Sequence, residues 1–150
     1  MASKFEVDEM VKSSADKFWG AIKESTELFP KIFPEQYKSV EIVEGDGQSV
    51  GSVRLIKFNE GMPIVKFSKE KIEVKDEAKK LVTYSVLEGD ILSFYKTFRA
   101  TLQVVPKEDG SLVKWSVEYD KVSEEVPEPD LIKDTAFKTF RDLDQYLLKN

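Results

Sequence analysis

The sequence contains neither cysteine nor histidine. Without cysteine the chain can form no disulfide bond and offers no thiolate ligand for zinc, which is compatible with a reducing compartment. Without histidine it lacks the usual general base at neutral pH, the Ser–His and Cys–His nucleophile pairs, and the commonest metal ligand. Any catalysis by this chain would therefore use Asp, Glu, Lys, Tyr or bound water.

Long apolar runs and basic clusters are also missing. No segment approaches the roughly 20 apolar residues of a membrane span. The N-terminus has no apolar signal core, so we expect a cytoplasmic protein without a membrane span. The 23 Lys and Arg residues are outnumbered by 28 Asp and Glu residues, which gives a net charge of −5. Because an acidic chain without a basic patch repels phosphate backbones, we expect no nucleic-acid partner.

Motifs for phosphate or metal binding are weak. The glycine-rich segment Gly45–Gly51 leads into a predicted strand, whereas Walker and dinucleotide motifs lead into a helix. Its glycines are better explained by a hairpin turn. No carboxylate dyad and no calcium-loop spacing stands out. We therefore expect no metal and no cofactor, with carboxylate ligands alone as the one route left open to a metal.

The chain does contain a regular series of alternating segments. Its 150 residues suit a single domain over residues 1–150. Apolar and polar residues alternate in stretches bounded by turn residues, which predicts antiparallel strands joined by hairpins. The predicted strands span residues 4–11, 37–44, 52–58, 64–74, 81–87, 91–105 and 112–119. The basic stretch Lys66–Lys71, in which Lys alternates with Glu and hydrophobic residues, is explained most simply as a solvated strand face.

Helical patterns occupy both ends of this series. Ser13 is expected to cap a first short helix, and a second is expected over Thr26–Phe33. From Leu131 to Leu148 apolar residues recur at helical spacing, which predicts an amphipathic helix of about five turns. Its apolar face consists of Ile132, Ala136, Phe140, Leu143 and Leu147, with Phe137 beside it. A curled sheet needs a cover, so we predict an α+β fold closed by this helix.

Aromatic residues are abundant, with 10 Phe, 5 Tyr and 2 Trp. An ordinary core accounts for them, but inward rings with tyrosine hydroxyls also suit a cavity for an amphipathic ligand. Two inward sets follow from strand register: Val82, Tyr84 and Val86, and Val113, Trp115, Val117 and Tyr119.

The strand over residues 91–105 has two possible phases. Its more apolar set is Phe98, Ala100, Leu102 and Val104. The other set is Tyr95, Thr97, Arg99, Thr101 and Gln103. A β-bulge could switch the inward face partway along the strand, so both phases stay open.

Short motifs in a specific order then carry a resemblance over the full length. They are Leu28-Phe29-Pro30 to Pro34, Glu44-Gly45-Asp46-Gly47 with Gly51-Ser52-Val53, Glu60-Gly61-Met62-Pro63, Tyr84-Ser85-Val86-Leu87-Glu88-Gly89-Asp90, Tyr95-Lys96-Thr97-Phe98, Val113-Lys114-Trp115 and Asp144-Gln145-Tyr146-Leu147-Leu148. The chain resembles the major latex protein-like members of the plant superfamily that includes the major birch pollen allergen and the class ten pathogenesis-related proteins. Its glycine loop is one residue longer than the pollen-allergen pattern.

The resemblance implies a helix-grip (START-like) fold, in which a seven-stranded antiparallel sheet wraps around a long C-terminal helix with two short helices below. It also implies an internal cavity for flavonoids, cytokinins, sterols, fatty acids or similar molecules. Cavity-facing positions implied by the resemblance are Arg54, Ile56, Phe58, Phe67, Tyr84, Tyr119, Ile132, Ala136 and Phe140. Adding the periodic aromatic positions Phe98, Trp115 and Phe137 completes the candidate ligand contacts.

Two kinds of relative are discounted. The abscisic-acid receptors carry a gate and a histidine latch that the turns Glu60–Ile64 and Glu88–Asp90 do not reproduce. The ribonuclease activity attributed to the superfamily would need a histidine as acid or base, and this chain has none.

Our first hypothesis is a carrier, buffer or receptor for a small hydrophobic metabolite. The alternative is a cofactor-free enzyme that steers cyclisation or isomerisation of a reactive terpenoid or alkaloid, with Tyr84 as candidate acid. Monomer and weak dimer both stay open.

Overall fold

The computed structural model describes residues 3–60 and 66–149. Seven strands form one antiparallel sheet in the order β1-β7-β6-β5-β4-β3-β2, so β1 and β2 are the two edges of an open sheet. The strands are β1 (Ser3–Val11), β2 (Tyr37–Glu44), β3 (Val53–Phe58), β4 (Phe67–Asp76), β5 (Leu81–Gly89), β6 (Tyr95–Lys107) and β7 (Gly110–Lys121). The helices are α1 (Ala15–Lys23), α2 (Ser25–Ile32), the short 3₁₀ helix η1 (Asp90–Ser93) and α3 (Asp130–Lys149).

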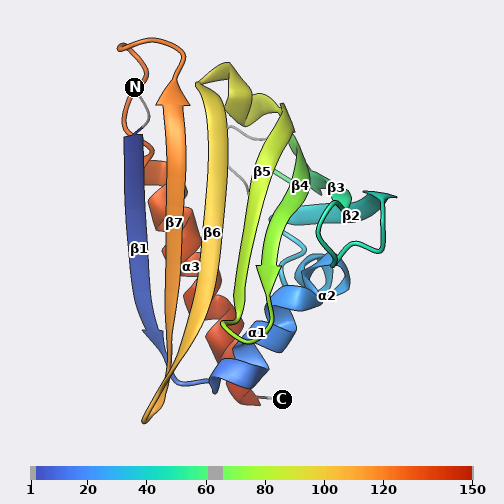
Figure 1. Ribbon diagram of the computed structural model, residues 1–150, viewed down its shortest axis with the longest axis vertical. Helices are drawn as coiled ribbons and strands as arrows, with labels where there is room; N and C mark the ends of the chain where they lie inside the picture. The colour runs from blue at the N-terminus through green and yellow to red at the C-terminus, as the bar shows by residue number, and fades with distance from the viewer. Residues whose placement is uncertain (1–2, 61–65, 150) are drawn as a thin grey trace.

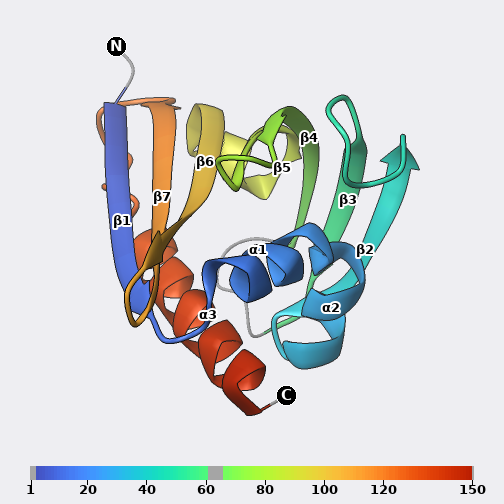
Figure 2. The same ribbon diagram turned by 60° about the horizontal axis from the view of Figure 1, so that its bottom comes forward.

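The sheet curls around the long helix. Figures 1 and 2 show α3 crossing the inner face of the sheet, with α1 beside its C-terminal half and α2 next to α1 and β2. α3 packs on β1, α1 packs on β6, and α2 packs on β2. The predicted α+β helix-grip fold is therefore confirmed, including the antiparallel sheet and the C-terminal helix. None of the helices in residues 3–60 and 66–149 is long and apolar enough to cross a membrane.

The inner face of β6 settles the phase that the sequence left open. The buried set is Phe98, Ala100, Leu102 and Val104, and a register shift lies between Tyr95 and Thr97. This bulge turns Tyr95 to the same inner face, where it is only 4% exposed. A single strand therefore buries residues of both sequence phases, because the bulge adds one residue to the alternation.

The segment before β6 differs from the prediction. Residues 90–93 form η1 rather than the start of a strand, so β6 begins at Tyr95. Gly89 adopts φ +139°, and a side chain there would overlap the backbone of Phe67. The Asp90 carboxylate then accepts hydrogen bonds from Lys66 N (2.6 Å) and Phe67 N (3.1 Å). These two hydrogen bonds turn the chain directly after β5, so residues 90–93 cannot form the extended beginning of β6. The predicted beginning of β4 at Ile64 lies outside the described residues.

The cap of the first helix is also corrected. Ser14, not Ser13, is the N-cap of α1, and its hydroxyl accepts a hydrogen bond from Lys17 N at 3.2 Å. Ser13 is buried and bonds to α3 instead: its backbone N–H and its hydroxyl both donate to Asp144, at 2.9 and 2.6 Å. Either of the two adjacent serines could cap the helix. Because Ser13 is bonded to Asp144 of α3, Ser14 is the one that caps α1.

Candidate functional site

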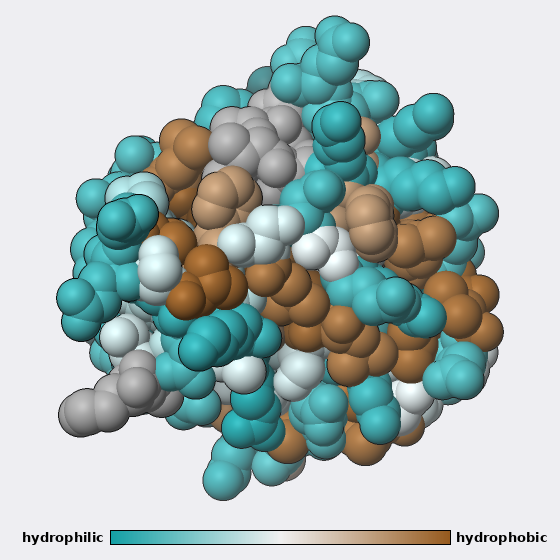
Figure 3. Space-filling model, turned by 90° about the horizontal axis from the view of Figure 1, so that it is seen from above, coloured by the Kyte–Doolittle hydropathy of each residue, from teal (hydrophilic) through white to brown (hydrophobic). Residues whose placement is uncertain are grey.

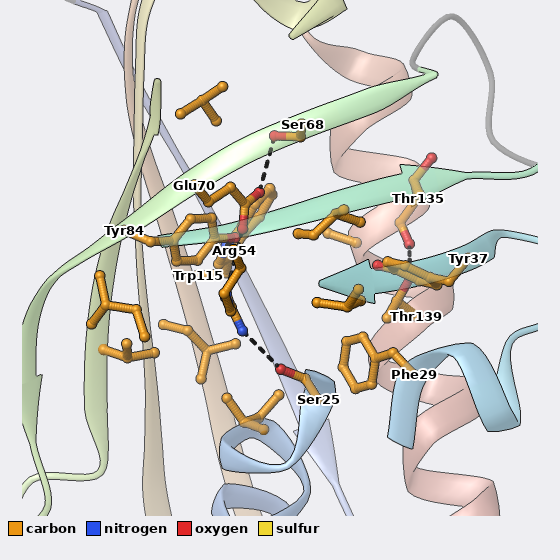
Figure 4. Close-up of a pocket in the computed structure, with 18 of the residues that line it drawn as sticks. Ser25, Phe29, Tyr37, Arg54, Ser68, Glu70, Tyr84, Trp115, Thr135 and Thr139 are labelled. Atoms are coloured by element: carbon orange, nitrogen blue, oxygen red, sulfur yellow. Dashed lines mark hydrogen bonds and ion pairs between the residues drawn. The ribbon is translucent and has the colours of Figure 1, made fainter. Parts of the chain in front are cut away.

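A cavity of about 250 Å³ lies between the inner face of the sheet and the helices. Its wall comes mainly from β2 to β5, from the first half of α3, and from the ends of α1 and α2. Most of the lining is apolar, for example Phe29, Ile56 and Val86. Figure 4 shows these elements surrounding a group of polar side chains on one side of the cavity.

The cavity reaches the surface near the start of α3. Leu131 lines it and is 48% exposed. Figure 3 shows hydrophobic side chains gathered on this end of the molecule, between hydrophilic ones. Leu87, at the end of β5, and Val122, just after β7, are further exposed hydrophobic residues. Leu131 therefore gives the cavity an apolar rim at this point.

The structure brings most of the predicted contacts together. Those that line the cavity are Arg54, Ile56, Phe58, Tyr84, Phe98, Trp115, Ile132, Ala136 and Phe140. They come from β3, β5, β6, β7 and α3, so residues far apart in the sequence share one wall.

Three predicted contacts lie elsewhere. Phe67 is 39% exposed, because the inward residues of β4 are Ser68, Glu70 and Ile72. Tyr119 is buried, but its hydroxyl donates to Glu128 Oε2 at 2.6 Å. That bond directs the hydroxyl to the segment between β7 and α3.

Phe137 is the third of these residues. It packs under the Arg141 guanidinium, whose Cζ atom is 5.4 Å from the ring centroid. It therefore occupies the flank of α3 beside the cavity-lining residues Ala136 and Phe140.

An ion pair occupies one wall of the cavity. Arg54 on β3 and Glu70 on β4 are cross-strand neighbours, and Arg54 Nη2 lies 3.4 Å from Glu70 Oε1. Their side chains are only 13% and 12% exposed. Ser25 of α2 accepts a hydrogen bond from Arg54 Nη1 at 3.2 Å, and Ser68 donates to Glu70 Oε2 at 3.3 Å (Figure 4). Two charges are thus held in an otherwise apolar space.

A second polar pair lies beside it. The Trp115 indole N–H donates to the Tyr84 hydroxyl at 3.2 Å. Burial raises the pKa of Tyr84, the nearby Glu70 carboxylate raises it further, and Trp115 and Arg54 act in the opposite direction. The pKa of Tyr37 is raised by burial and by Glu70, against Arg54. Both hydroxyls therefore stay protonated at neutral pH and can donate hydrogen bonds to a ligand.

The pKa of Glu70 is subject to two opposing effects. Burial raises the pKa of its carboxyl group above the usual range for glutamate, while Arg54 and the Ser68 hydroxyl act to lower it. The Arg54 guanidinium carries five N–H groups. Its bonds to the described residues use one N–H on Nη1 and one on Nη2, and the buried Nε has no partner among them. The cluster therefore retains donors for a further acceptor.

Glu70 and Tyr37 line the cavity but were not predicted from the sequence. Glu70 was assigned to a solvated face because it stands among the lysines of the basic stretch Lys66–Lys71. One signal pointed to the inside: Ser68, Glu70 and Ile72 share a strand phase, and Ile72 is buried. Tyr37 at the start of β2 had no comparable pattern. Among the described residues no group of three His, Cys, Asp or Glu could hold a metal ion.

These features define a class: a helix-grip domain whose curled sheet and long helix enclose an apolar cavity with one polar wall. Residues 1–150 match the profile of the Pathogenesis-related protein Bet v 1 family, and the chain belongs to that family. It is 48% identical over 143 residues to MLP-like protein 423 of Arabidopsis thaliana, covering 95% of this chain and 92% of that protein. The resemblance to the major latex protein-like group is therefore confirmed.

Solved structures agree with the fold. A ginseng major latex-like protein 151 from Panax ginseng superposes with a TM-score of 0.89 at 28% identity, covering 98% of each chain. Norcoclaurine synthase from Thalictrum flavum, solved in complex with dopamine and hydroxybenzaldehyde, superposes with a TM-score of 0.75 at 23% identity. That alignment covers 100% of this chain and 88% of the synthase, and it shows a shared fold.

Proposed function

We propose that the protein binds a small hydrophobic metabolite in its internal cavity, as a carrier, buffer or receptor. The observation that carries the proposal is the 250 Å³ cavity, whose apolar wall surrounds one cluster of hydrogen-bonding groups. Concave apolar sites with a few polar groups are typical of small-molecule binding, and a volume near the lower end of their range favours a small ligand. The cytoplasm is the proposed place of binding.

A neutral dye tests this proposal. N-phenylnaphthylamine should bind with one-to-one stoichiometry, and flavonoids or terpenoids should displace it. Ala136→Trp fills the cavity from α3 and should abolish binding. Lys138→Trp is the matched control on the same helix, because Lys138 has a 65% exposed side chain. The proposal is wrong if the dye does not saturate, or if both variants bind it equally.

The second candidate function is catalysis in the same cavity. It is favoured by Tyr84, whose oxygen accepts from Trp115 while its proton has no acceptor in the described part of the chain. A neutral phenol so placed can donate to a carbonyl or enolate oxygen. Norcoclaurine synthase shares the fold and was solved in complex with dopamine and hydroxybenzaldehyde, which supports this fold as a scaffold for chemistry.

Tyr84→Phe separates the two functions, because it removes only the hydroxyl. A panel of reactive terpenoid and alkaloid precursors would be incubated with and without the protein, and rates and products compared. An enzyme with Tyr84 as acid should lose about a hundredfold in rate or more. A binder should lose only about fivefold in affinity, the effect of one neutral hydrogen bond. If the wild-type protein changes neither rate nor products, catalysis is excluded for that panel.

A further inference from the structure

The polar cluster of Arg54, Glu70, Tyr37 and Tyr84 in the cavity wall has no net charge when Glu70 is ionised. Arg54 and the ionised Glu70 contribute one charge of each sign, held 3.4 Å apart on side chains that are 13% and 12% exposed. Tyr37 and Tyr84, which face this pair from β2 and β5, keep their protons because their pKa values are raised. The arrangement therefore offers hydrogen bonds in the cavity without offering an unbalanced charge.

Two lysines also line the cavity and pair with a carboxylate outside it. Lys23 and Lys75 both pair with Glu77, at 3.3 and 3.4 Å. The Lys23 and Lys75 side chains are 32% and 16% exposed, whereas Glu77 is 56% exposed and does not line the cavity. Both ammonium groups are therefore held by a surface carboxylate outside the lining, whereas both charges of the Arg54–Glu70 pair belong to residues that line the cavity.

An anionic ligand would meet a specific obstacle at this wall. Its carboxylate would approach Arg54, whose charge is already balanced by Glu70, and two carboxylates would then share one guanidinium. Burial of an unbalanced charge is strongly unfavourable. An uncharged oxygen meets no such repulsion, and it can accept one of the Arg54 N–H groups that the bonds to Ser25 and Glu70 leave unused.

We propose that Glu70 sets the charge specificity of the cavity. By neutralising Arg54 it restricts the ligand to uncharged molecules that carry a hydrogen-bond-accepting oxygen, such as a ketone, an aldehyde or an alcohol, and it rejects the corresponding carboxylates. This inference rests on the proposed binding function and specifies its ligand class.

Three probes with one ring system test the inference: acetonaphthone, naphthoate and naphthalene. They are measured by calorimetry with the full chain at neutral pH. The wild-type protein should bind acetonaphthone about tenfold more tightly than naphthoate or better, because only the acid brings an unbalanced charge. It should also bind acetonaphthone more tightly than naphthalene, because only the ketone can accept from Arg54.

Glu70→Gln should reverse the preference for the ketone over the acid. The amide keeps the shape of the side chain but leaves the Arg54 charge unbalanced, so naphthoate should bind at least about tenfold more tightly than to the wild type. Glu88→Gln is the matched control, since Glu88 is a carboxylate with a 64% exposed side chain on the neighbouring strand β5. It should leave all three affinities unchanged.

The double variant Arg54→Gln with Glu70→Gln guards against a variant that fails to fold. It removes both charges together, so it avoids an unpaired buried charge and should still reject naphthoate. Wild-type binding of naphthoate as tight as that of acetonaphthone would overturn the charge selection while leaving the proposed function intact. An unchanged preference in folded Glu70→Gln would also overturn it. Failure of all three probes to bind the wild-type protein would contradict both the inference and the proposed function.

Discussion

The buried carboxylate of Asp144 joins the two ends of the chain and gives the sharpest stability prediction. It accepts hydrogen bonds from Lys12 N (3.0 Å), Ser13 N (2.9 Å) and the Ser13 hydroxyl (2.6 Å). Asp144 is 7% exposed and Ser13 is 3% exposed, so water cannot easily replace the lost acceptor. Asp144→Ala therefore leaves three donors without their carboxylate.

The size of the effect follows from these bonds. A buried donor left without an acceptor costs about 1–3 kcal/mol. Because such losses are not additive and the Lys12 amide is partly solvated, we expect a total loss of about 3–5 kcal/mol. For a chain of this length that lowers Tm by about 10 °C.

Urea unfolding followed by tryptophan fluorescence measures this loss. The matched control is Asp142→Ala, two residues earlier on α3, where the carboxylate has a 44% exposed side chain and pairs with Lys138 at 3.0 Å. An exposed pair of this spacing contributes about 0.5 kcal/mol or less. If Asp144→Ala and Asp142→Ala lose similar free energies of unfolding, the link from α3 to the turn after β1 does not stabilise the fold as argued.

Three further predictions concern packing, backbone and charge. Phe140→Asp should unfold the domain, because it buries a charge beside Phe18 and Trp115. Lys138→Asp at an exposed site should lower the free energy of unfolding by less than about 1 kcal/mol, and thermal melts compare the two variants. Gly110→Ala should cost more than about 1 kcal/mol in urea unfolding, because φ is +148° and the new methyl group would overlap the Val11 carbonyl, whereas Gly20→Ala, in a helix with open space, should stabilise by about 0.5–1 kcal/mol. Naphthalene sulfonate stays anionic at all accessible pH values, so its affinity reports the charge of the cavity. Because burial raises the pKa of Glu70, lowering the pH protonates this carboxylate, leaves the Arg54 charge unbalanced and should raise the affinity of the wild-type protein. Calorimetry with Glu70→Gln should show no such rise.

The strand series was predictable because each strand has one buried face, which forces alternation into the sequence. Where a strand carries a bulge, alternation cannot locate the shift, as the buried pair Tyr95 and Phe98 shows. The phase of β6 depends on its pairing with β7, which is a tertiary contact. The sequence therefore predicted the sheet but left the inward set of this strand open.

The candidate site was predictable only in its apolar part. Tyr84 and Trp115 sit among valines at inward positions, so their placement follows from local pattern. Glu70 lies in a run of alternating charges that is usually solvated. Its inward position becomes reasonable only with Arg54 directly opposite on β3, which supplies the balancing charge. An ion pair of this kind depends on how two strands pair, so the sequence of either strand alone does not predict it.

Packing and binding fall on opposite sides of the fold. Side chains without exposed surface, such as Phe18, Val104, Val113 and Leu143, belong to α1, β6, β7 and the second half of α3. The cavity wall comes mainly from β2 to β5, whose inward side chains are often only half-buried. Because atoms that face a void lose dispersion contacts, the hollow side is the weaker one, and close packing on the other side compensates for it.

This division predicts where a ligand stabilises the protein. A ligand that fills the cavity adds contacts to β2–β5, and at a hundredfold excess over Kd it should raise the free energy of unfolding by about 2.7 kcal/mol. In native-state hydrogen exchange the amides of β3 and β4 should gain protection first, since they open locally against the void. Amides of β7, where Val113 and Val117 are fully buried, should change only through global unfolding. Equal gains in β4 and β7 under conditions of local opening would show that the hollow side is no weaker than the packed side, and the separation of binding from packing would then be wrong.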